Sequence, residues 1–170
     1  MATPHPPKAS HRAWLVRFVL PLAAGVVTLT CVWFWAHPSG TQAYGFPLDD
    51  SWTHMVYARE LAETGLLAYN PGIPATEATS PLWVGFLALV QLVVGRPSLN
   101  GIILTVYVAG SLCFLWSIYL LTRLTAVITA FDWPGTVAGI VLAISPAMAS
   151  AAFSGMEVLL CAVLLKAPDD

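Results

Sequence analysis

Residues 18–36, FVLPLAAGVVTLTCVWFWA, form an apolar run without a single charged side chain. About 20 apolar residues in an α-helix cross the ~30 Å hydrocarbon core of a bilayer. Basic residues precede the run, the last of them Arg17, and such residues tend to stay on the cytoplasmic side. The sequence therefore predicts a disordered cytoplasmic N-terminus over 1–13, a transmembrane helix over 14–36 and an external segment after it. A cleaved signal peptide is the alternative, although its apolar region is usually shorter.

The composition indicates the same class of protein. Hydrophobic residues make up 58% of the chain and charged residues only 9%, whereas soluble domains carry roughly 25% charged residues. The net charge of -2 leaves no basic surplus for nucleic acid. We therefore expect an all-α polytopic protein of the cytoplasmic (inner) membrane, with the lipid bilayer as its surroundings and no nucleic-acid partner.

Further apolar runs follow, and their lengths differ. Two have spanning length, 101–121 and 134–153, whereas 81–95 is a short apolar helix that either inserts partly or spans. Partial insertion returns Ser154 to the external side; full crossing moves it to the cytoplasmic side. The last segment, 157–170, reads as the start of a truncated helix, so the chain is expected to be the N-terminal fragment of a longer protein.

The segment 37–80 is the main polar part of the chain and is predicted to be an external loop. It contains the acidic pair Asp49-Asp50 and an interfacial helix over 51–64, with Asp50 as its N-cap. Helical spacing gathers apolar residues and Arg59 on one side, which suits a helix lying in the membrane plane. The side chains expected on the opposite, polar side are Thr53, His54, Tyr57, Glu60 and Thr64.

The loop continues with signals of compact structure. Asn70-Pro71-Gly72 is a turn sequence, and Thr79-Ser80-Pro81 places a cap and a proline at the start of the next helix. A simple tether between two spans does not need two helices and stiff turns.

These residues together resemble a known family. Asp49-Asp50, Tyr57-Ala58-Arg59, Tyr69-Asn70-Pro71-Gly72 and Thr79-Ser80-Pro81-Leu82-Trp83 are similar to the first external loop of GT-C glycosyltransferases. Ser154-Gly155-Met156-Glu157 resembles a later "SG(M/L)E" motif of the branch that includes bacterial arabinofuranosyltransferases. The resemblance covers residues 45–95 well and 134–160 loosely.

The resemblance implies a fold and an activity. The fold would have GT-C-like N-terminal helices and a structured external loop with two juxtamembrane helices. The activity would be transfer of a sugar from a polyprenyl-phosphate donor to a cell-envelope glycan or lipid acceptor. Asp49 and Asp50 would be the catalytic candidates, either as a general base or as ligands of a divalent cation. The family is longer and has more spans, so this chain is expected to be inactive by itself.

The chemistry of the residues agrees with that assignment and leaves alternatives open. A carboxylate at the membrane boundary is a suitable base for an acceptor hydroxyl, but Asp50 is equally a helix cap. The candidate substrate-binding residues are Arg59 for phosphate, His54 beside the carboxylates, Glu157 in the later motif and Tyr69 for sugar stacking. Each also has a structural explanation, such as interface anchoring for Arg59 and Tyr69. The alternative class is a non-enzymatic small membrane protein or a truncated remnant, and a transporter fragment is a weaker third.

Overall fold

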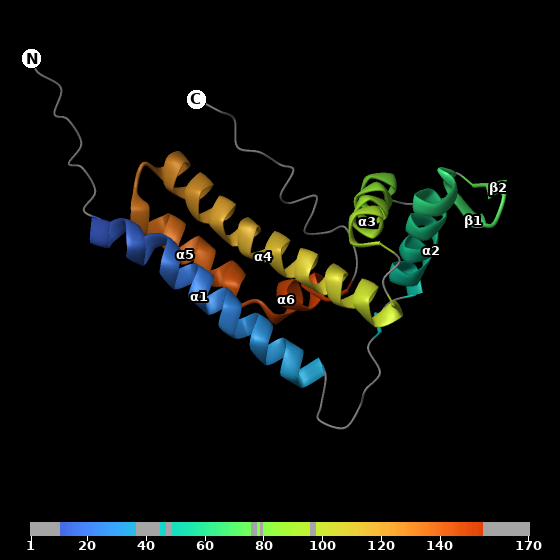
Figure 1. Ribbon diagram of the computed structural model, residues 1–170. Coiled ribbons are helices and arrows are strands. Elements are labelled where there is room, and N and C mark those ends of the chain that lie inside the picture. Colours follow the sequence, from blue (N-terminus) through green and yellow to red (C-terminus); the bar gives the residue numbers. More distant parts are fainter. Residues whose placement is uncertain are drawn as a thin grey trace, which may run out of the picture.

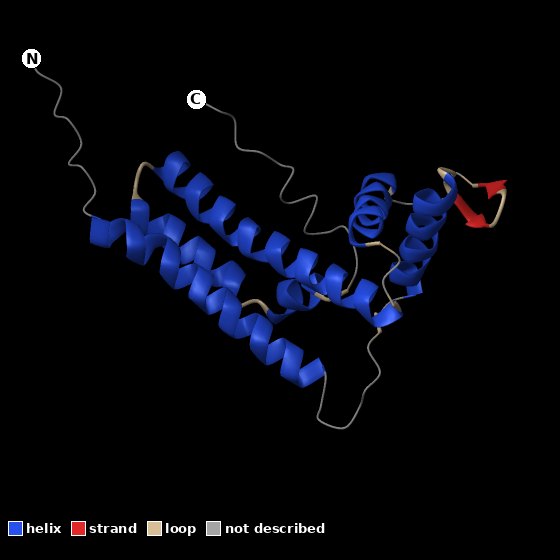
Figure 2. Ribbon diagram, viewed as in Figure 1, coloured by secondary structure: helices blue, strands red, loops and turns tan. Residues whose placement is uncertain are grey.

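The computed structural model describes residues 11–36, 45, 46, 49–75, 78, 80–95 and 98–154. Most of these residues are helical, and a two-stranded antiparallel hairpin is the sheet found among them (Figure 2). The elements are α1 (His11–Ala36), α2 (Asp49–Thr64), β1 (Ala68–Asn70), β2 (Ile73–Pro74), α3 (Pro81–Val94), α4 (Leu99–Thr129), α5 (Asp132–Ala143) and α6 (Pro146–Ala152).

Two helices are long and apolar enough to cross a membrane. They are α1, over Val16–Trp35, and α4, over Leu99–Thr129. The pair α5 and α6 passes the same criteria as one span, although the two helices meet at an angle of 66°. The 31 residues of α4 correspond to about 46 Å, which exceeds the ~30 Å hydrocarbon core.

Helices α1, α4 and α5 run side by side as a bundle (Figure 1). Arg17 in α1 forms an ion pair with Asp132, which begins α5 just after α4 ends. At the other end of the bundle, Trp33 of α1 packs against Tyr107 near the start of α4, with ring centres 5.7 Å apart. The helices α1 and α4 are therefore antiparallel, and the end of α6 returns to the end of the bundle where α4 begins.

The break between α5 and α6 has a local cause. Pro146 has no backbone N–H and disfavours helical geometry in the residue before it. Ser145 accordingly is extended, with a ψ of 109°, and its hydroxyl accepts a hydrogen bond from the backbone N–H of Met148. The run predicted as one helix over 134–153 is thus two helices.

The helices α2 and α3 and the hairpin gather at the end of the bundle where α4 begins (Figure 1). Figure 1 views α3 nearly along its axis and α4 from the side, so α3 crosses α4. Trp83, Val84 and Leu87 of α3 are buried in one core cluster with Ile103 and Val106 of α4. The 14 residues of α3 span about 21 Å, less than the hydrocarbon core.

Several bounds differ from those expected from the sequence. Helix α2 begins at Asp49 rather than at residue 51, so Asp50 lies within its first turn and is not the N-cap that the sequence predicted. Helix α4 continues past 101–121 to Thr129 and includes Arg123. Helix α1 begins at His11 rather than at residue 14, so residues 11–13 are helical and not disordered as predicted. Residues 1–10 and 157–170 lie outside the described residues.

Cysteines placed at Asn70 and Asp132 are expected to be labelled from opposite sides of the membrane. Asp132 pairs with Arg17 at one end of the bundle, whereas Asn70 lies in the hairpin at the other end. In a chain whose own cysteines are replaced by alanine, a membrane-impermeant maleimide should label Asn70→Cys in intact cells. It should reach Asp132→Cys only after permeabilisation. Labelling of both variants from outside would contradict a crossing by α4.

Candidate functional site

Asp49 and Asp50 begin α2, and the residue that follows them is hydrogen-bonded to a residue far away in the sequence. The side chain of Asp50 is exposed, whereas Ser51 is 1% exposed. The Ser51 hydroxyl donates a hydrogen bond to the backbone carbonyl of Ser154, which lies 103 residues away. The structure therefore joins the segment that contains the acidic pair to the first residue of the SGME motif.

A cluster of aromatic rings surrounds this junction. The aromatic cluster consists of Trp33, Phe46, Trp52, Tyr107 and Phe153. Phe46 contacts Trp52 in the first turn of α2, with ring centres 5.1 Å apart. Tyr107 of α4 lies edge-on to Phe46 and Phe153 at 5.8 and 5.5 Å. Such pairs contribute about 0.5–1.5 kcal/mol beyond the burial of their area, so the cluster fixes the start of α2 against the bundle.

The burial of α2 corrects the polar face expected from helical spacing. His54, Tyr57 and Glu60 were expected on the polar side, but they are only 2%, 2% and 5% exposed. The reason is that α2 packs against α3 and against β1, and that it shares one core cluster with α3 and α4. His54 is therefore neither a solvated histidine nor a surface group; it is buried one turn after Asp50.

Arg59 lies on the opposite, exposed side of α2. It follows Asp50 by nine residues, which at 100° per residue is half a turn around the helix and about 13 Å along it. The structure therefore does not bring the guanidinium together with the acidic pair.

Tyr69 lies in β1, beyond the far end of α2. Its ring is 47% exposed and packs against the buried ring of Tyr57 at 5.8 Å between centres. The hairpin that carries it closes at Pro71-Gly72, where Gly72 adopts a φ of 77°, a conformation that glycine adopts without steric cost. The sequence indicated the turn but not the strands, and Tyr69 is not brought to Asp50.

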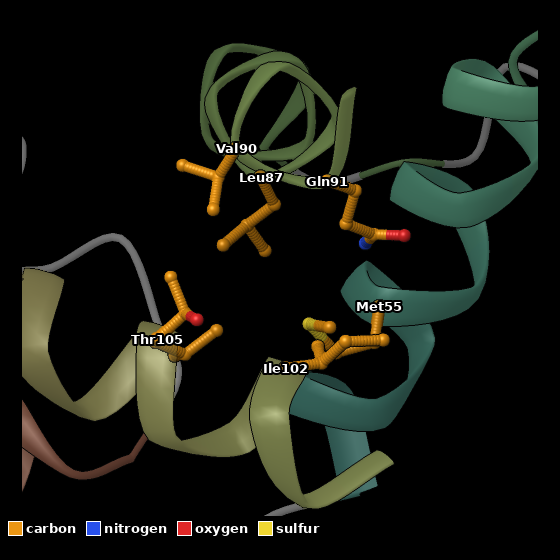
Figure 3. A pocket seen from close by; sticks show the side chains of 7 residues that line it. Met55, Leu87, Val90, Gln91, Ile102 and Thr105 are labelled. Carbon is orange, nitrogen blue, oxygen red and sulfur yellow. The ribbon is translucent and has the colours of Figure 1, made fainter. Parts of the chain in front are cut away.

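Two cavities lie beside α3. Figure 3 shows a narrow crevice between α2, α3 and α4, lined mainly by apolar side chains, among them Met55, Leu87 and Ile102. A larger cavity of about 240 Å³ lies between the carboxyl ends of α2 and α3 and includes Glu63 and Gln91. The buried amide nitrogen of Gln91 has no hydrogen-bond partner among the residues that the structure describes. Neither cavity is lined by Asp50 or His54.

The remaining predictions concern a metal and the later motif. Among the described residues, no group of three or more histidine, cysteine, aspartate or glutamate side chains is placed to hold a metal ion. A divalent cation at Asp49 and Asp50 stays a prediction. Glu157 lies outside the described residues.

Sequence reasoning alone missed the residues that join the site. Nothing in the local pattern marks Ser51, Tyr107 or Phe153, because each looks like an ordinary packing residue of an apolar chain. A contact across 103 residues would be visible only as co-variation between aligned relatives.

The fold and the junction define a class: a helical chain suited to a membrane, with an acidic pair at one end of its bundle. Comparisons with known proteins add no family to this class. Neither a family model, nor a curated protein, nor a solved structure matches the chain.

Proposed function

We propose that this chain is the N-terminal part of an integral-membrane glycosyltransferase. The enzyme would transfer a sugar from a polyprenyl-phosphate donor to a glycan or lipid acceptor outside the cytoplasmic membrane. The observation that carries the proposal is the hydrogen bond between Ser51 and Ser154. It joins the residue that follows the Asp49-Asp50 motif to the first residue of the later SGME motif, although these two parts of the resemblance are far apart in the sequence.

The position of the acidic pair supports this chemistry. Asp50 is exposed at the end of a bundle whose helices are long and apolar enough to cross a membrane, and this position supports its proposed contact with a lipid-linked donor and an acceptor outside the membrane. In the proposed reaction, one carboxylate of the pair accepts the proton of an acceptor hydroxyl. The hydroxyl oxygen bonds to the anomeric carbon as the bond from that carbon to the phosphate oxygen breaks, and the polyprenyl phosphate leaves with the electron pair.

The later motif would act from the other side of the junction. Glu157 follows Ser154 by three residues, a length of chain that spans at most about 11 Å. This closeness in the sequence to Ser154, which is hydrogen-bonded to Ser51, is the reason to keep Glu157 as a substrate-binding candidate. A divalent cation held by Asp49 and Asp50 would neutralise charge on the leaving phosphate, and carboxylate oxygens are suitable ligands for such a cation.

Other candidate roles change with the geometry. Because Arg59 lies on the opposite side of α2 from Asp50, we do not assign it to the same phosphate. His54 is buried one turn from the pair, and we assign it to supporting the start of α2 rather than to binding substrate.

A transfer assay tests the proposal. Membranes that contain the product of a full-length relative or a reconstructed gene are expected to move labelled sugar from a synthetic polyprenyl-phosphate arabinose, or from another pentose or hexose donor of that type, to an envelope glycan. Membranes that contain the 170-residue chain alone are expected to show no transfer, because a lipid donor needs a groove between more helices. Membranes without the gene are the control.

The same assay can exclude the proposal. A complete gene product that is abundant in the membrane but transfers no sugar from any donor of the panel would favour the non-enzymatic alternative. If the coding sequence does not continue into further apolar spans, in frame or after one frameshift, the proposed ancestry also fails.

A further inference from the structure

Tyr107 contacts three separate segments of the chain. It lies near the start of α4 and is 3% exposed. Its hydroxyl donates a hydrogen bond of 2.5 Å to the backbone carbonyl of Gly45. Its ring lies edge-on to Trp33 at the end of α1, to Phe46 before α2, and to Phe153 after α6.

Two of these three segments adjoin the candidate site in the sequence. Gly45 and Phe46 precede Asp49 and Asp50 by a few residues, and Phe46 also packs against Trp52 within α2. On the other side, Phe153 is the neighbour of Ser154, whose carbonyl accepts the hydrogen bond from Ser51. One side chain thus contacts the segments on both sides of the junction.

We infer that Tyr107 is the positioning residue that sets the start of α2 against the end of α6. Helix α4 is the longest element and packs against α1, α5 and α6, so it provides a fixed reference. The ring packing can be made by phenylalanine as well, but the hydrogen bond to Gly45 cannot. The hydrogen bond from the Tyr107 hydroxyl to Gly45 therefore fixes the distance between α4 and the segment that precedes α2.

The inference deepens the proposed function, because the residues that Tyr107 positions are the proposed catalytic pair. The placement itself does not depend on which reaction occurs. A distance measurement can therefore fail or succeed independently of any transfer assay.

The test compares two distances by electron paramagnetic resonance in lipid nanodiscs, with the full chain and its native cysteines replaced by alanine. Spin labels at Arg59 in α2 and Ser150 in α6, both exposed, measure the distance between α2 and α6 across the junction. Labels at Val26 in α1 and Val137 in α5, also exposed, report the bundle.

In Tyr107→Phe, we expect the junction distribution to broaden and to include a longer distance, while the bundle distribution matches that of the parent chain. The matched control is Tyr119→Phe on the same helix, whose ring packs against Phe18 beyond the junction; it should change neither distribution. An unchanged junction distribution in Tyr107→Phe would overturn the inference. Equal broadening of both distributions would also overturn it, because Tyr107 would then support the bundle as a whole.

Discussion

In at least one of the variants Asp49→Asn and Asp50→Asn, the rate of sugar transfer is expected to fall about 10²–10⁴-fold, the usual contribution of a general base. Asparagine keeps the shape of aspartate, but it cannot accept the proton. The amount of protein in the membrane should therefore stay the same. The variants belong in a full-length relative or a reconstructed gene, with rate and membrane abundance measured together.

Asp49→Asn and Asp50→Asn are measured side by side, because either of the two neighbouring carboxylates can be the base. A loss of activity in at least one of the two variants, at normal abundance, supports the catalytic assignment. The matched control is Glu63→Gln, which removes an exposed carboxylate from the same helix about 20 Å along its axis from Asp50. Near-normal rates in both aspartate variants would mean that the pair has only a structural role in the first turn of α2.

Gly110→Ala is expected to destabilise the folded chain more than any other single methyl addition proposed for it. A Cβ at Gly110 would lie 2.0 Å from the carbonyl oxygen of Ala152, and 2.9 Å from the carbonyl carbon. Both atoms belong to the backbone of α6, so the contact can be relieved only by moving the helix. Overpacking of this kind costs about 1–3 kcal/mol, and occasionally more. Because Ser154 follows Ala152 closely, the shift should also weaken its hydrogen bond with Ser51.

The matched control is Gly85→Ala in α3, where a Cβ meets no atom within 4 Å. Alanine in a helix interior is more favourable than glycine by about 0.5–1 kcal/mol, so this variant should be slightly more stable than the parent chain. The stability of Gly139→Ala should lie between those of the other two variants. The atom nearest to a Cβ at Gly139 is the Thr122 hydroxyl oxygen, which can rotate away. The measurement is the unfolding midpoint of purified protein in bicelles. Equal midpoints for Gly110→Ala and Gly85→Ala would mean that α6 does not pack closely on α4.

Local sequence patterns indicated most of the helices but not how they end. The charge-free run before Ala36 is long enough for one span, and α1 covers it. The same reasoning ended the predicted helix 101–121 at residue 121, yet α4 continues to Thr129. The extra turns carry Thr122, Leu124 and Ala126, whose side chains are buried or partly buried in the bundle. Pro146 was recognisable as a helix breaker, but its 66° bend depends on how α6 packs.

The candidate site was predictable only in part. The acidic pair and the turn at Asn70-Pro71-Gly72 stand out as residue types in a chain with few charges. The orientation of α2 did not follow from its own periodicity, since His54 and Glu60 are buried by neighbours that helical spacing does not reveal. Arg59 and Tyr69 were named as substrate-binding candidates for the chemistry of their side chains, but Arg59 lies half a turn around α2 from Asp50 and Tyr69 lies in β1.

The amino-acid sequence by itself determined the class of protein, because so few charged residues cannot cover a water-soluble surface and because runs of this length match a bilayer. It also determined where charge is concentrated, since Asp49 and Asp50 are neighbours in the chain. Only the tertiary structure decided that Ser51 is hydrogen-bonded to Ser154 and that Tyr107 contacts the segments on both sides of that junction. Such contacts depend on the close approach of α4 and α6 at Gly110, and a contact between residues so far apart leaves no periodic trace in the sequence.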